Sequence, residues 1–169
     1  MSSEARFRFA IDQLDLQPHH RVLEVGCGHG VAASAIADRL SGGYYLGVDR
    51  SPKMIASAER RLAGALAEGR AELTCTSFAD AVLDSRHFDR IFAARVVAMT
   101  RTPELTIAAR LLAPDGVLVM AFDAPGQEPS PELIAATTTN LAATGFGEPE
   151  LTRHESDGQV VVCVRTGRR

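Results

Sequence analysis

Apolar positions along the chain change between two periods, one typical of helices and the other of strands. Residues 4–15 carry Phe7, Ala10, Ile11 and Leu14 at the spacing of an amphipathic helix. Short apolar runs then alternate with further segments of helical spacing. The runs that predict strands are 22–25, 44–48, 71–75, 88–94, 117–122, 150–154 and 159–164. The helical faces between them are Ala33 to Leu40, Met54 to Leu66, Leu105 to Leu112 and Leu133 to Leu141.

This alternation of strands and helices predicts the α/β class, with parallel strands joined by right-handed crossovers. The turn sequence Ser156-Asp157-Gly158 instead predicts a closing hairpin, which adds an antiparallel strand. We expect one domain over residues 1–169, in which residues 1–20 form an N-terminal helix and loop and residues 21–169 form the core. Sheets of this class bind ligands beyond the carboxyl ends of their strands, so functional residues are expected there.

Composition and charge exclude several classes of function. The chain of 169 residues has a formal net charge of −3 and no basic stripe, so we expect it to bind no nucleic acid. No run is long and apolar enough to span a bilayer, and Met1 to Leu16 is too charged for a signal peptide. Cys27, Cys75 and Cys163 are far apart in the sequence, which predicts free thiols in a cytoplasmic protein and no metal site.

The most informative stretch joins the first predicted strand to the helix that follows it. Residues 21–30 read RVLEVGCGHG, so an apolar strand runs into glycines at positions 26, 28 and 30. Glycines there let the backbone turn tightly and approach a ligand, and the start of the helix directs free N–H groups toward it. Asp49 ends the second strand, where a carboxylate can accept hydrogen bonds from both hydroxyls of a ribose. Its alternative role is to cap the helix that follows Ser51.

Two features distinguish this loop from a dinucleotide-binding fingerprint. The third glycine stands at position 30, and Val31 occupies the position where that fingerprint has glycine. Glu24 is an acid at a buried strand end, where it needs a partner, and a cationic ligand would supply one. Both features argue against a dinucleotide as the ligand of this loop, so an NAD(P)-dependent oxidoreductase is a weak hypothesis for the function of the chain.

Four segments resemble the successive motifs of class I S-adenosylmethionine-dependent methyltransferases. They are VLEVGCGHG, YLGVDRSPKMI, FDRIFAARVV and LLAPDGVLVM, and they lie in order within residues 20–123. The resemblance implies a Rossmann-like three-layer αβα sandwich. Its seven-stranded, mostly parallel sheet would have the order 3-2-1-4-5-7-6 and end in the antiparallel hairpin. The resemblance also implies S-adenosyl-L-methionine as cofactor and S-adenosyl-L-homocysteine as product.

The same resemblance assigns roles to residues at the carboxyl ends of the strands. The glycine loop would hold the methionine end and the ribose, Glu24 would face the sulfonium and amino side, and Asp49 would hold the ribose hydroxyls. Ser77 and Phe78 would meet the adenine, although Thr76-Ser77-Phe78 stands where many members have Gly-Asp-Ala and so lacks the usual acid. The predicted cofactor contacts are Glu24, Gly26, Cys27, Gly28, Gly30, Asp49, Arg50, Ser77, Phe78 and Ala94.

The methyl acceptor is expected to be a small molecule. Arg95 and Asp123 are the candidates for acceptor binding or catalysis, although a surface arginine and an ordinary loop carboxylate are equally consistent with the sequence. The stretch from Ala93 to Val97 has no acid and one cation, so we expect metal-independent transfer. The chain lacks a large inserted cap, so the acceptor site is open, or it is covered by the first helix or by a partner subunit of a homodimer. A non-catalytic S-adenosylmethionine-binding module is the alternative function.

Overall fold

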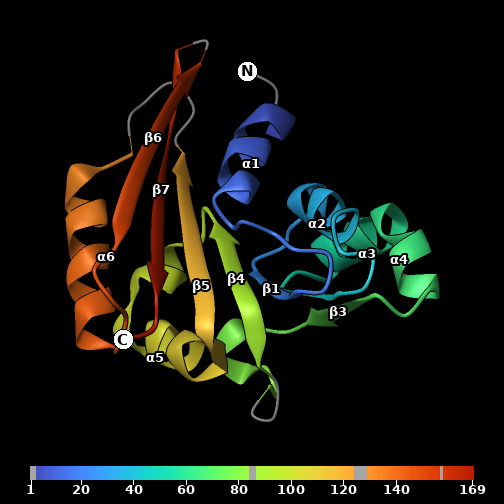
Figure 1. Cartoon of the computed structure of the whole chain (residues 1–169). Coiled ribbons are helices and arrows are strands. Elements are labelled where there is room, and N and C mark those ends of the chain that lie inside the picture. Colours follow the sequence, from blue (N-terminus) through green and yellow to red (C-terminus); the bar gives the residue numbers. More distant parts are fainter. Residues whose placement is uncertain (1–2, 84–86, 124–128, 157) are drawn as a thin grey trace.

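The computed structural model describes residues 3–83, 87–123, 129–156 and 158–169. Within them, a seven-stranded sheet has the order β3-β2-β1-β4-β5-β7-β6, which confirms the predicted order (Figure 1). β1 to β5 are parallel, whereas β7 is antiparallel to both β5 and β6. The strands are β1 Arg21–Val25, β2 Tyr44–Asp49, β3 Ala71–Cys75, β4 Phe88–Ala94, β5 Leu112–Asp123, β6 Glu150–Ser156 and β7 Gln159–Gly167. Asp157, in the predicted turn of the hairpin, lies outside the described residues.

Helices cover both faces of the sheet, so the fold has three layers (Figure 1). α1 to α4 pack on one face against Val22 and Tyr45, whereas α5 and α6 pack on the other face with Leu23 and Val25. The alternation along β1 is the two-residue period of a strand that is buried on both sides. The helices are α1 Ser3–Asp12, α2 Val31–Ala37, α3 Pro52–Arg61, α4 Ala63–Ala67, α5 Thr102–Leu111 and α6 Pro131–Ala143, with 3₁₀ turns η1 Phe78–Asp80 and η2 Val97–Thr100.

Some elements differ from the sequence predictions. The predicted helix from Met54 to Leu66 breaks at Leu62, which has φ −99° and ψ 12°, and so becomes α3 and α4. Leu112, predicted on a helix, is the first residue of β5, where its extended backbone pairs with Phe88. The spacing misassigned it because Leu112 is fully buried in the strand, and apolar spacing alone does not separate a buried strand position from a buried helical one. η1 and η2 were not predicted, since such short turns show no helical period.

This topology brings the carboxyl ends of β1 to β4 to one edge of the sheet. The connections from β1 and β4 lead to opposite faces, α2 on one side and α5 on the other, so the strand order reverses between these two neighbouring strands. A crevice forms at such a point because the two connections diverge. Among the helices of the described residues, none has the length and apolar character needed to cross a membrane.

Candidate functional site

The loop between β1 and α2 contains the three glycines of the predicted cofactor loop. It is tied to β2, because the N–H groups of Gly26 and Cys27 donate to the carbonyl oxygen of Val48 at 2.7 and 3.2 Å. Gly26, Gly28 and Gly30 have φ values of +74°, +53° and +77°, in the left-handed region that residues with a Cβ rarely adopt. The prediction of a tight glycine turn is therefore confirmed.

Two of the glycines also permit close packing inside the protein. A Cβ on Gly26 would lie 2.5 Å from Cγ2 of Val96, and a Cβ on Gly30 would lie 2.9 Å from Cα of Ala58 in α3. The Gly30 contact lets α3 pack closely against the start of α2. The sequence analysis missed this role because Val96 and Ala58 are distant from the loop in sequence.

Asp49, the last residue of β2, lies beside this loop with both carboxylate oxygens held by backbone donors. Oδ2 accepts from the Gly28 N–H and Oδ1 accepts from the Ser51 N–H, each at 2.9 Å. The side chain of Ser51 is the N-cap of α3, since its Oγ accepts from the Met54 N–H. The capping role considered for Asp49 therefore belongs to Ser51, and Asp49 keeps further lone pairs that can accept from a ligand.

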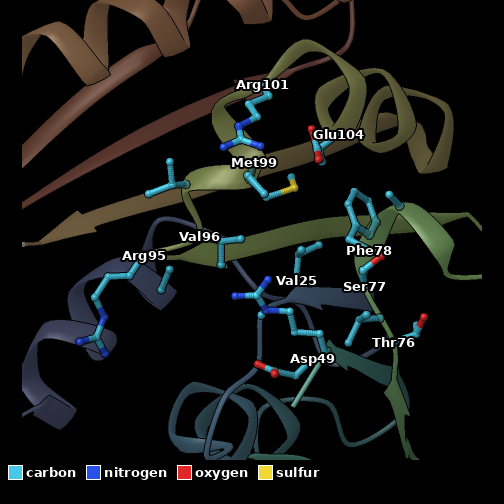
Figure 2. A pocket seen from close by; sticks show the side chains of 17 residues that line it. Val25, Asp49, Thr76, Ser77, Phe78, Arg95, Val96, Met99, Arg101 and Glu104 are labelled. Atoms are coloured by element: carbon cyan, nitrogen blue, oxygen red, sulfur yellow. The ribbon is translucent and has the colours of Figure 1, made fainter.

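A cavity of about 650 Å³ opens at the carboxyl ends of the central strands and extends to η1 and α5 (Figure 2). The predicted site residues that line it are Gly26, Asp49, Arg50, Ser77, Phe78, Ala94 and Arg95. Those that do not line it are Glu24, Cys27, Gly28, Gly30 and Asp123. The lining residues that the sequence analysis missed include Ala98, Met99, Arg101 and Glu104. These residues belong to no recognised motif, and helical spacing identifies buried positions without showing that they face a cavity.

Glu24 lies on β1, two residues before Gly26, and its side chain is buried with a relative exposure of 2%. The hydroxyl of Tyr45 on β2 donates to Glu24 Oε2 at 2.6 Å. Burial raises the pKa of Glu24 to about 8, the charge of Asp49 adds to this, and the Tyr45 hydrogen bond opposes it. Its hydrogen-bond partner within the protein is thus Tyr45, and the predicted contact between Glu24 and a cofactor stays a prediction.

The two acceptor-side candidates, Arg95 and Asp123, lie together. Arg95 Nε is 3.4 Å from Asp123 Oδ1, and the guanidinium carbon lies 5.5 Å from the ring centre of Phe7 in α1. Arg95 has φ +59°, an uncommon value for a residue with a side chain. Its N–H donates to the Ala121 carbonyl oxygen at 2.9 Å, which ties this turn to β5. The arginine, which is one of the lining residues of the cavity, thus connects β4, β5 and α1.

The family model described as "Methyltransferase domain" matches residues 22–116, which include the glycine loop, Asp49 and all the described residues that line the cavity. The chain belongs to the methyltransferase domain family. A curated relative is YrhH of Bacillus subtilis strain 168, which is named provisionally as a methyltransferase. It is 27% identical over 115 residues, and the match covers 67% of this chain and 63% of YrhH. The matched part of this methyltransferase domain protein thus spans less than two thirds of the relative's length.

Solved structures of similar fold include enzymes with different reactions. Precorrin-6y C5,15-methyltransferase from Geobacter metallireducens has a TM-score of 0.77 at 18% identity, with 100% of this chain and 90% of that chain covered. Magnesium protoporphyrin IX methyltransferase from Synechocystis PCC 6803, with bound S-adenosylhomocysteine, has a TM-score of 0.76 at 17% identity. The match covers 98% of this chain and 83% of that chain. The [4+2]-cyclase SpnF has a TM-score of 0.79 at 15% identity, and the match covers 98% of this chain and 81% of that chain. At these identities the likeness concerns the fold.

In this methyltransferase domain, the turn after β3 uses its polar groups internally. Ser77 Oγ donates to Asp80 Oδ2 at 2.5 Å and accepts from the Asp80 N–H at 3.3 Å. Asp80 is exposed and does not line the cavity, so it does not replace the acid that is missing at Ser77. In the described part of the chain, no three His, Cys, Asp or Glu side chains gather as a metal site would require. Metal independence stays a prediction.

Proposed function

We propose that this chain is an S-adenosylmethionine-dependent methyltransferase that acts on a small molecule without a metal ion. The observation that carries the proposal is the placement of Asp49. Its carboxylate lines a cavity at the strand ends and is held by the N–H groups of Gly28 and Ser51. A carboxylate fixed in this way is prepared to accept hydrogen bonds from the two hydroxyls of a ribose.

The residues that line the cavity suit the parts of the cofactor. Gly26 and Ala94 would border the methionine end, Asp49 would hold the ribose, and Arg50 and Phe78 would flank the adenine. Phe78 offers an apolar ring for a base, with only 7% of its surface exposed. Magnesium protoporphyrin IX methyltransferase, which shares the fold, has been crystallised with S-adenosylmethionine and with S-adenosylhomocysteine. The family membership and this fit support S-adenosylmethionine as the cofactor.

Bound S-adenosylmethionine would supply an activated methyl group, which leaves its sulfonium when an acceptor lone pair displaces it. The residues of this chain would then bind both molecules, align the acceptor with the methyl group and exclude water. Arg95, at the mouth of the cavity, favours an acceptor that carries an anionic or carboxylate group. Such an acceptor would share the guanidinium with Asp123, which lies 3.4 Å away in the structure.

The proposal extends to partners and location. The formal net charge of −3 disfavours nucleic acid as partner, and the free cysteines suit the reducing cytoplasm. α1 contributes Phe7 beside Arg95, so this helix, or a partner subunit of a homodimer, would cover the acceptor.

A non-catalytic S-adenosylmethionine-binding module is the second candidate. The pairing of Asp123 with Arg95 favours it, since this pairing leaves the predicted acceptor-side carboxylate engaged within the protein. Binding alone does not separate the two candidates, whereas methyl transfer does.

Calorimetry and a transfer assay test the proposal. We expect S-adenosylmethionine and S-adenosylhomocysteine to bind with Kd values in the range from low micromolar to millimolar, and NAD to bind much more weakly. Tighter binding of NAD would refute the choice of cofactor. With cofactor labelled in its methyl group, label should appear in a small-molecule fraction of a cell extract. Label confined to protein would refute a small-molecule acceptor, and binding without any transfer would favour the non-catalytic module.

A further inference from the structure

The cavity wall includes a carboxylate with one buried oxygen that accepts no hydrogen bond within the described residues. Glu104 lies in the first turn of α5 and its side chain lines the cavity (Figure 2). Its Oε2 atom is buried and has no hydrogen-bond partner among the residues that the structure describes. A buried carboxylate oxygen without a donor is costly in free energy, so a donor from a ligand would satisfy it.

The position of Glu104 limits which part of a ligand it can meet. α5 packs against η1, and the first residue of η1 is Phe78, which lines the same cavity. Asp49, the other carboxylate among the described lining residues, already holds the N–H groups of Gly28 and Ser51. Ser77 is engaged with Asp80. Among the described lining residues, Glu104 is therefore the carboxylate that remains on the side of the cavity formed by α5 and η1.

The next step rests on the proposed function. S-adenosylmethionine has three kinds of N–H or O–H donor, namely the ribose hydroxyls, the ammonium group and the 6-amino group of adenine. Asp49 is placed for the hydroxyls, and the ammonium belongs to the methionine end beside Gly26 and Ala94. We infer that Glu104 accepts a hydrogen bond from the 6-amino group of adenine. It would thus supply, from α5, the acid that the turn after β3 lacks.

A second effect of Glu104 must be separated from this one. A carboxylate in the first turn of a helix also interacts favourably with the helix dipole, and this effect needs no ligand. It would change the melting temperature of the protein but not its preference between two bases. Discrimination between an amino group and an oxygen at position 6 of the purine is therefore the informative measurement.

The experiment compares S-adenosylhomocysteine with S-inosylhomocysteine, in which an oxygen replaces the 6-amino group. Calorimetry gives both Kd values for the unaltered chain, Glu104→Gln, Glu104→Ala and the control Glu59→Gln. Glu59 is an exposed glutamate on α3 that does not line the cavity. We expect the unaltered chain and the control to prefer the adenosyl compound by at least about 10-fold, because a carboxylate repels the 6-oxygen.

The two Glu104 variants should lose this preference for different reasons. The amide of Glu104→Gln can donate to the 6-oxygen or accept from the 6-amino group, so the two Kd values should differ by less than about 3-fold. Glu104→Ala should weaken binding of the adenosyl compound by about 5- to 20-fold and also bring the two Kd values together. Melting curves of each variant verify that the fold persists.

Two outcomes would overturn the inference, and they are distinct. If the unaltered chain binds neither compound, the proposed function fails and the inference fails with it. If the unaltered chain binds the adenosyl compound and both Glu104 variants keep the full preference of the control, the proposed function stands. Glu104 is then not the contact of the 6-amino group.

Discussion

Replacing Glu24 with glutamine tests whether one buried carboxyl group makes the stability of the protein depend on pH. Glu24 is buried and accepts a hydrogen bond from Tyr45, and burial raises its pKa from 4.5 to about 8. At pH values between these two pKa values, Glu24 is protonated in the folded chain and ionised in the unfolded chain. The folded state then binds more protons than the unfolded state, so the free energy of unfolding decreases as the pH rises through this window.

The size of the effect follows from the two pKa values. Inside the window, one group lowers the free energy of unfolding by at most about 1.4 kcal/mol per pH unit. The rise in the pKa of Glu24 from 4.5 to about 8 therefore corresponds to a maximum decrease of about 5 kcal/mol in the free energy of unfolding. Outside the window both states have the same protonation, so the contribution of Glu24 no longer changes. Glu24→Gln keeps an acceptor for the Tyr45 hydroxyl but has no proton to lose.

Urea unfolding at pH 5, 6, 7 and 8 measures this difference. Between pH 5 and pH 8 the unaltered chain should lose about 2–4 kcal/mol of unfolding free energy relative to Glu24→Gln. Groups that titrate in both proteins cancel in the comparison. His20, whose pKa is lowered by burial, is one of them. Parallel pH profiles for the two proteins would show that Glu24 is ionised in the folded state and would refute the argument.

Four further predictions concern the site. Asp49→Ala should weaken cofactor binding by about 1–3 kcal/mol in calorimetry, since charge-assisted hydrogen bonds to the ribose are lost; unchanged affinity would place the ribose elsewhere. Gly30→Ala should lower the unfolding free energy by about 2–4 kcal/mol, because its φ is left-handed and its Cβ would collide with Ala58; a neutral result in urea unfolding would contradict this. Arg95→Ala should raise the KM for the acceptor by a larger factor than it raises the Kd for S-adenosylhomocysteine; a larger factor for the Kd would show that Arg95 does not bind the acceptor. Methyl transfer should persist in excess EDTA, and loss of turnover that magnesium restores would refute metal independence.

The sequence by itself determined the class of the fold and the position of its glycine loop. The run from Val22 to Val25 predicts a strand, and apolar spacing identifies the helices between the strands. These are local properties, because the period of a segment depends on the nearest residues alone. Three alternate glycines followed by Asp49 at the next strand end similarly indicated a ribose site before any contact was known. The order of the strands came from the family resemblance rather than from the spacing.

The tertiary structure alone decided which side chains meet. Helical spacing indicates that Glu104 lies near buried positions of α5, but only the packing of α5 on η1 turns its carboxylate into the wall of a cavity. Likewise, the partner of Glu24 is Tyr45 on the neighbouring strand, and the partners of Arg95 are Asp123 and Phe7. These contacts join segments that are far apart in the chain. Hydrogen bonds, ion pairs and burial depend on distances in space, which a one-dimensional pattern of polar and apolar residues does not contain.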